Sequence, residues 1–141
     1  MNDDLWILGV RAAGVFHLLT VALAHFTPIP PGWDENLARL PDVHRRFAIA
    51  QNVFIGATMV CAGVVSLLFA PDLVAGSTPA RIVCAGIALW WGGRLVVLPW
   101  LRVWPELRTT LLRAGFVFLH AECAAFALAF GWLALRGAGR T

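Results

Sequence analysis

Four long apolar runs divide this chain and restrict it to folds that a lipid bilayer accepts. The runs hold 22, 24, 20 and 25 residues and cover residues 5–26, 47–70, 82–101 and 111–135. At a rise of about 1.5 Å per residue, helices of these lengths match a hydrocarbon core of roughly 30 Å. None of the runs alternates polar with apolar residues, so strands of a membrane barrel are not indicated. The sequence therefore predicts an all-α integral membrane protein, a four-helix up-down bundle.

Composition agrees with a bilayer environment. Of the 141 residues, 60% are hydrophobic and only 13% are charged, whereas soluble domains carry about a quarter of charged residues. The length allows one domain, and we expect a single transmembrane domain over residues 1–141. The net charge of +3 comes from arginines spread over the loops. Because they do not cluster with aromatics on one face, nucleic acid is not an expected partner.

The distribution of arginine predicts the orientation in the membrane. The side that holds the first and third loops carries six arginines, and the side with both termini carries three or four. By the positive-inside rule, loops 27–46 and 102–110 are cytoplasmic and both termini lie outside, in a bacterial inner membrane. The six arginines are Arg39, Arg45, Arg46, Arg102, Arg108 and Arg113. On the same side, a basic rim suited to anionic lipids makes membrane lipids an expected partner. The rim consists of His44, Arg45, Arg46, Arg102, Arg108 and Arg113.

Two shorter features are predicted at the membrane surface. Trp33, Leu37 and Leu40 share one face of a short interfacial helix over residues 33–40. Pro105 is predicted as the first helical residue of a long fourth span, because proline is well tolerated at that position.

Two charged residues interrupt the apolar runs. Arg94 lies about 10 Å from the cytoplasmic side and Glu122 about 16 Å from the same side, at 1.5 Å per residue. Side chains lean toward the N-terminus of their own helix, so on antiparallel helices these two lean toward each other. Each charge costs about 3 kcal/mol at a bilayer centre unless it is paired. We expect an ion pair between Arg94 and Glu122, which either fixes helix register or marks a functional site.

Further polar residues are expected near that pair. His17 and His120 lie at matching depths and allow a haem or a metal ion as an alternative to structural hydrogen bonding. His17 and Asn52 fall on stripes of small residues in the first and second spans. Trp90 lies one turn from Arg94, where a cation–π contact is predicted. Three cysteines, Cys61, Cys84 and Cys123, are expected to be small apolar core residues.

Two motifs carry a resemblance to known proteins. They are the stretch Leu40-Pro41-Asp42-Val43-His44-Arg45-Arg46 and the stretch Ala88-Leu89-Trp90-Trp91-Gly92-Gly93-Arg94-Leu95. With them the chain resembles small four-span bacterial membrane proteins of no assigned function. Its size and the early Arg11 are also similar to the layout of DoxX-type proteins. The resemblance implies the four-span fold and assigns no catalytic or binding residue.

The expected function is that of a small non-enzymatic membrane protein, either an accessory subunit or a lipid- or small-ligand-binding module. A second copy or another membrane protein is a possible partner. The alternative is a membrane enzyme or proton-linked transporter for a quinone or isoprenoid-like substrate, with Glu122 and His120 as catalytic candidates. A third reading is a bis-histidine haem protein; otherwise no cofactor is expected. The candidate ligand-binding residues are Arg94, Glu122, His17, Trp90 and Asn52.

Overall fold

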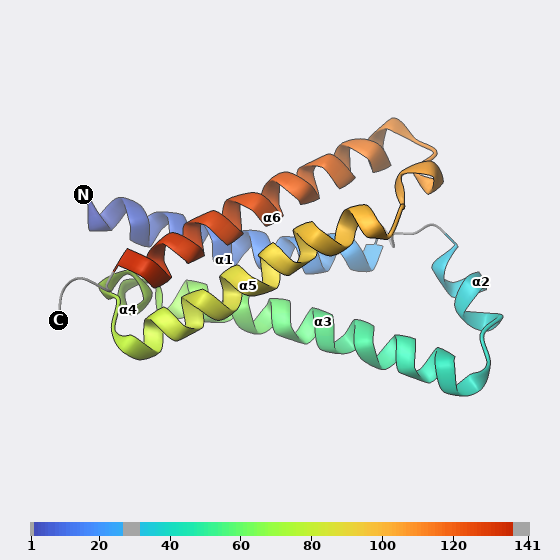
Figure 1. Ribbon diagram of the computed structural model, residues 1–141, viewed down its shortest axis with the longest axis horizontal. Coiled ribbons are helices and arrows are strands. Elements are labelled where there is room, and N and C mark those ends of the chain that lie inside the picture. Colours follow the sequence, from blue (N-terminus) through green and yellow to red (C-terminus); the bar gives the residue numbers. More distant parts are fainter. Residues whose placement is uncertain (1, 27–31, 137–141) are drawn as a thin grey trace. The chain divides into compact units, whose positions relative to one another are not determined.

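The computed structural model describes residues 2–26 and 32–136 and is helical throughout, with no strand in those ranges. Figure 1 labels helices α1 to α6. Their bounds are α1 Asp3–Phe26, α2 Trp33–Ala38, α3 Asp42–Leu68, α4 Ala70–Ala75, α5 Thr78–Trp100, the 3₁₀ turn η1 Trp104–Glu106, and α6 Thr110–Arg136.

Four of these helices, α1, α3, α5 and α6, are long and apolar enough to cross a membrane. Each covers nearly all of one predicted apolar run, and α2 occupies the place of the predicted interfacial helix. By length and composition the chain is a multi-pass membrane protein.

The described residues form two compact units. The α1–α3 unit contains Val10–Leu68, and the α5–α6 unit contains Met1–Gly9 together with Phe69–Thr141. The single-domain prediction and the up-down order of the four spans stay predictions.

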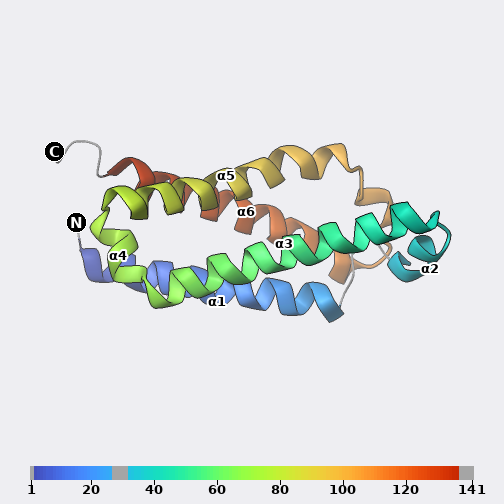
Figure 2. The ribbon, with the colours of Figure 1, turned by 90° about the horizontal axis from the view of Figure 1, so that it is seen from below.

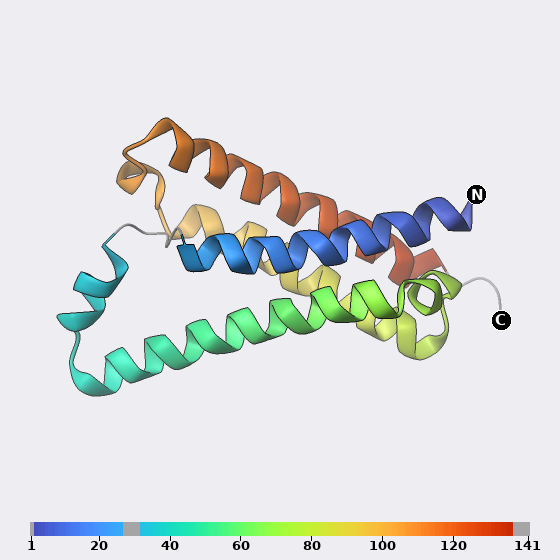
Figure 3. The same cartoon turned by 180° about the vertical axis from the view of Figure 1, so that it is seen from behind.

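Helices α1 and α3 cross at two glycines inside the α1–α3 unit. A Cβ atom added to Gly14 would meet the Gly63 carbonyl oxygen at 2.8 Å, and one added to Gly63 would meet the Gly14 carbonyl oxygen at 3.1 Å. The two backbones are therefore in contact, which only residues without a side chain allow. Figures 2 and 3 show α1 in blue beside α3 in green, and Figure 3 shows them separating toward α2.

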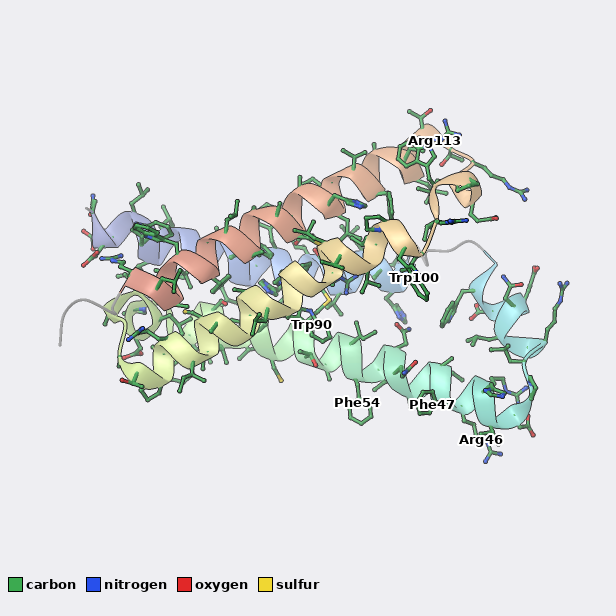
Figure 4. All side chains as sticks on the ribbon, viewed as in Figure 1. Arg46, Phe47, Phe54, Trp90, Trp100 and Arg113 are labelled. Atoms are coloured by element: carbon green, nitrogen blue, oxygen red, sulfur yellow. The ribbon has the colours of Figure 1, made fainter. Side chains whose placement is uncertain are left out.

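Away from this crossing, the first half of α3 presents apolar side chains to its surroundings. Val43, Phe47 and Phe54 are all exposed, and Figure 4 shows Phe47 and Phe54 projecting from the same side of the helix. In a bilayer such a face suits acyl chains, because lipid tails are as apolar as these side chains.

Helices α5 and α6 run antiparallel inside the α5–α6 unit. The facing surfaces of the pair, from Arg81 to Arg94 and from Glu122 to Ala134, are called the seam below. Small residues bring the helices together: a Cβ added to Gly131 would lie 3.8 Å from the Ala88 Cβ atom. Near one end, Arg81 Nε donates a hydrogen bond of 2.8 Å to the carbonyl oxygen of Ala134.

Two helix starts differ from the sequence prediction. Pro105 belongs to η1, and α6 begins at Thr110, so the prediction that Pro105 starts the fourth span is wrong. The Thr109 hydroxyl accepts the backbone N–H of Leu112, which caps the first turn of α6. Helix α4 was not predicted, although Pro71 in its first turn and the left-handed Gly76 at its end are ordinary start and stop signals.

Candidate ligand site in the α5–α6 seam

The centre of the seam holds a polar cluster between apolar and aromatic neighbours. The seam cluster consists of Arg94 from α5 and of Glu122 and Cys123 from α6. Arg94 donates a side-chain hydrogen bond to the Cys123 thiol, and the charges of Arg94 and Glu122 both act on that thiol. Opposite charges from two neighbouring helices therefore influence the same thiol.

Glu122 is enclosed by protein. The residue is only 6% exposed. A carboxylate facing acyl chains would cost on the order of 3 kcal/mol, so enclosure beside a guanidinium removes that contact with lipid. The predicted ion pair between Arg94 and Glu122 stays a prediction, and the charges of both side chains act on the Cys123 thiol.

Aromatic rings form one wall beside the cluster. The Arg94 guanidinium carbon lies 5.6 Å from the centre of the Trp91 ring, a cation–π arrangement of about 1–2 kcal/mol when it is desolvated. Trp91 is fully buried and meets Phe126 edge-on, with ring centres 5.1 Å apart. The structure shows this contact at Trp91, and the contact predicted between Trp90 and Arg94 stays a prediction. Both indoles lie within one turn of Arg94, but Trp91 also packs across the seam.

Trp90 has a different property. Its indole nitrogen is inaccessible and has no hydrogen-bond partner among the described residues, while its ring is half-buried in the middle of α5 (Figure 4). A buried N–H without an acceptor costs about 1–3 kcal/mol. A ligand oxygen that accepts this N–H would remove that cost, so Trp90 is included in the candidate site together with the seam cluster.

His120 is turned toward its own helix. Its Nδ1 donates to the Phe116 carbonyl oxygen at 2.8 Å, and its ring meets the Phe116 ring edge-on at 4.5 Å between centres. His17, which is fully buried, makes the same bond to Ala13 at 2.7 Å in α1. Both bonds leave Nε2 as the nitrogen that points away from the backbone.

The two histidines belong to different units, His17 to the α1–α3 unit and His120 to the α5–α6 unit. A haem or metal site shared by them therefore stays a prediction. Within residues 2–26 and 32–136, no group of three or more His, Cys, Asp or Glu side chains is arranged to hold a metal ion.

Asn52 also lies outside the seam. It belongs to the α1–α3 unit and is exposed, whereas Met59, Gly63 and Ser66, farther along the same predicted stripe, are buried. The inner face predicted for α3 is thus confined to its second half. Membership of Asn52 and His17 in a common polar cluster with Arg94 stays a prediction.

Cys123 is the site residue that sequence reasoning missed. The sequence predicts a small apolar core residue at this position, and Cys123 is fully buried. Its thiol also accepts a hydrogen bond from Arg94 and is affected by the charge of Glu122. Its position directly after Glu122 was the available signal. On a helix, consecutive residues point about 100° apart, so adjacency alone did not show that both face the seam.

Comparisons with known proteins leave the site to be interpreted from its own geometry. No protein-family model matches the chain, and neither the curated proteins nor the solved structures contain a match.

Proposed function

We propose that this chain is a small-ligand-binding module of a membrane, and that the seam cluster and Trp90 hold the polar head of a lipid-soluble ligand. The observation that carries the proposal is the Trp90 indole N–H, which is inaccessible and lacks an acceptor among the described residues. Trp90 and Arg94 are four residues apart on α5, so both donors are directed to one side of that helix.

The ligand class follows from these groups. Trp90 and Arg94 carry hydrogen-bond donors and Glu122 carries acceptors, and Trp91 and Phe126 pack beside Arg94. Sites of this kind orient an apolar molecule through a few polar contacts. A quinone fits this description, because its carbonyl oxygens accept hydrogen bonds and its ring and tail are apolar.

Binding without turnover is the function we favour over catalysis or proton-linked transport. The alternative is supported by one feature, the carboxylate of Glu122 beside a thiol and a guanidinium, which is a group able to exchange a proton. Consumption of a quinone or isoprenoid in a reaction that needs Glu122 would establish the alternative.

We place the protein in a bacterial inner membrane as an up-down bundle, with loops 27–46 and 102–110 in the cytoplasm. The support is the excess of arginine on that side. Reporter fusions at the C-terminus and within the loop at residue 108 test the orientation: an enzyme active only outside the cytoplasm should work at the C-terminus alone.

Equilibrium binding of a radiolabelled short-chain ubiquinone to the purified full-length protein tests the ligand proposal. Trp90→Phe keeps the aromatic surface and removes the N–H, and we expect about fivefold weaker binding from the loss of one hydrogen bond. Arg94→Leu/Glu122→Leu should weaken binding more strongly.

Trp132→Phe is the matched control, because Trp132 is exposed on α6, and its binding should equal that of the wild type. A wild-type protein that does not bind the quinone, or a Trp90→Phe variant that binds it equally well, would overturn the proposal.

A further inference from the structure

The turn between α5 and α6 is an ordered element in its own right. Leu107 is fully buried, and its backbone N–H donates to Trp104 at 3.2 Å, while the N–H of Glu106 donates to Val103 at 2.9 Å. The buried leucine and these hydrogen bonds hold the backbone of the turn in place. The Cα atoms of the residues in the turn therefore have defined positions.

Arg113 is fixed against this turn by two contacts. Its Nε donates a hydrogen bond of 2.9 Å to the carbonyl oxygen of Leu107, and its guanidinium carbon lies 5.8 Å from the centre of the Trp104 ring. Trp104 is itself packed against Phe116, with ring centres 6.2 Å apart. The described residues offer its two terminal amino groups no further hydrogen bond, and Arg113 is exposed.

Those two amino groups form the edge of a guanidinium that matches an anion. A planar guanidinium donates two parallel hydrogen bonds to a phosphate, and a fixed one loses less conformational entropy when it does so. Arg102 and Arg108 are also exposed on this turn, and Glu106 is its one carboxylate, so the arginines leave a positive balance. Arg113 lies in the first turn of α6, where the helix dipole is also positive and no acidic residue is present.

The flanks of the turn identify the source of the phosphate. Trp100 is 79% exposed at the end of α5, and Leu111 is 80% exposed at the start of α6; Figure 4 shows Trp100 and Arg113 on either side of the turn. Exposed tryptophan and leucine beside arginine are typical of the depth where acyl chains meet headgroups. These flanks favour the phosphate of a lipid over free phosphate as the ligand.

We propose that the α5–α6 turn is a binding site for the phosphate of an anionic phospholipid headgroup, with Arg113 as its oriented ligand and Arg102 and Arg108 as flexible ones. This goes beyond a general attraction of arginines to an anionic leaflet, because the side chains differ in role. A diffuse field depends only on charge, whereas this site depends on the guanidinium fork of one residue.

Native mass spectrometry of the full-length protein tests the proposal by titrating phosphatidylglycerol against phosphatidylcholine. We expect the wild type to retain phosphatidylglycerol in preference, and Arg113→Gln to lower that preference about tenfold. Arg113→Lys keeps the charge but loses the fork and the stacking surface, so it should behave like Arg113→Gln.

Arg46→Gln is the matched control, an exposed arginine of the predicted basic rim on α3, and as one charge of the diffuse field it should lower the preference much less than Arg113→Gln does. Because Arg113 also holds the turn, Arg108→Gln provides a second measure, with an expected loss of about fivefold. Helix content by circular dichroism should be equal in all variants. The proposed site is contradicted if Arg113→Lys retains the full preference or if Arg108→Gln has no effect. It is also contradicted if Arg46→Gln lowers the preference as much as Arg113→Gln does. Displacement of phosphatidylglycerol by inorganic phosphate at a similar concentration would overturn the lipid source.

Discussion

The two helix pairs of this protein are held together by different kinds of contact. In the α1–α3 unit the backbones touch at Gly14 and Gly63, with no room for a Cβ atom. In the α5–α6 unit the contact is made by side chains: Trp91 packs on Phe126, and Arg94 reaches Cys123 beside Glu122.

The difference follows from the solvent. Lipid tails are as apolar as the helices, so association depends on close packing and on polar contacts rather than on the hydrophobic effect. A glycine crossing provides close packing and leaves no group for chemistry. A seam with charges is stabilised only while its polar groups satisfy one another, and it provides donors and acceptors to a ligand. The comparison predicts a rigid α1–α3 crossing and a functional α5–α6 seam.

The largest expected effect is the loss of one charge of the seam cluster. Arg94→Leu removes the opposite charge from the buried Glu122 and should lower the free energy of unfolding by about 3–5 kcal/mol. Glu122→Leu leaves the half-buried Arg94 charge behind and should cost less. The measurement is unfolding of the purified protein in mixed micelles by titration with a denaturing detergent.

The double variant Arg94→Leu/Glu122→Leu distinguishes two charges that compensate each other from two charges that act independently. If the charges compensate each other, it should recover most of the stability that either single variant loses. Losses that simply add would contradict the predicted ion pair. Arg46→Leu, at an exposed position on α3, is the control and should change stability by less than about 0.5 kcal/mol.

The second effect tests the backbone contact of the α1–α3 unit. Gly14→Ala places a methyl group 2.8 Å from the Gly63 carbonyl oxygen and 2.8 Å from Leu67 Cγ, and the forced separation should cost about 1–3 kcal/mol. The same detergent titration measures it.

Gly56→Ala on α3 is the matched change, because nothing lies within 4 Å of the added Cβ. It should be neutral or stabilise the helix by up to about 1 kcal/mol. Equal effects of the two alanines would show that the crossing does not hold α1 and α3 together.

The smallest effect compares the centre of the α5–α6 unit with its exposed end. Asp3 and Arg136 form an ion pair in this unit, in which the Asp3 side chain is 59% exposed and the Arg136 side chain 15% exposed. Because water screens the Asp3 carboxylate, Arg136→Gln should cost about 1 kcal/mol, and less at high salt. The Asp42–Arg45 pair of α3, with N···O at 2.5 Å, is the local counterpart, and Arg45→Gln should cost no more. A large loss in Arg136→Gln that persists at high salt would show that the pair at the unit's end is structural.

Helix positions were predictable where one local signal dominated. The four apolar runs and the short Trp33–Ala38 helix lie where the sequence placed them, because hydrocarbon length and helical periodicity act within a segment. Pro105 misled the prediction: proline suits the first turn of an α-helix and of a 3₁₀ turn alike, and the hydroxyl cap at Thr109 decides where α6 begins.

The candidate site was only partly predictable for a different reason. Arg94 and Glu122 are conspicuous because charge is expensive in a bilayer. The partner of each depends on the rotation of α5 against α6, which a sequence pattern fixes only to about one residue. Because of that uncertainty, the sequence does not show whether Trp90 or Trp91 contacts Arg94. It also does not show that Cys123 interacts with Arg94.

Segment length and hydropathy predict that this chain is helical, how many helices are long enough to cross a membrane, and which two charges are expensive to expose to lipid. These properties follow from segment length and transfer free energy, which each segment carries alone. The tertiary structure adds that the Cys123 thiol interacts with Arg94 and Glu122, that the Trp90 indole N–H lacks an acceptor among the described residues, and that Arg113 is held against the turn. Contacts of this kind depend on the rotation and separation of two helices, and packing between helices sets both.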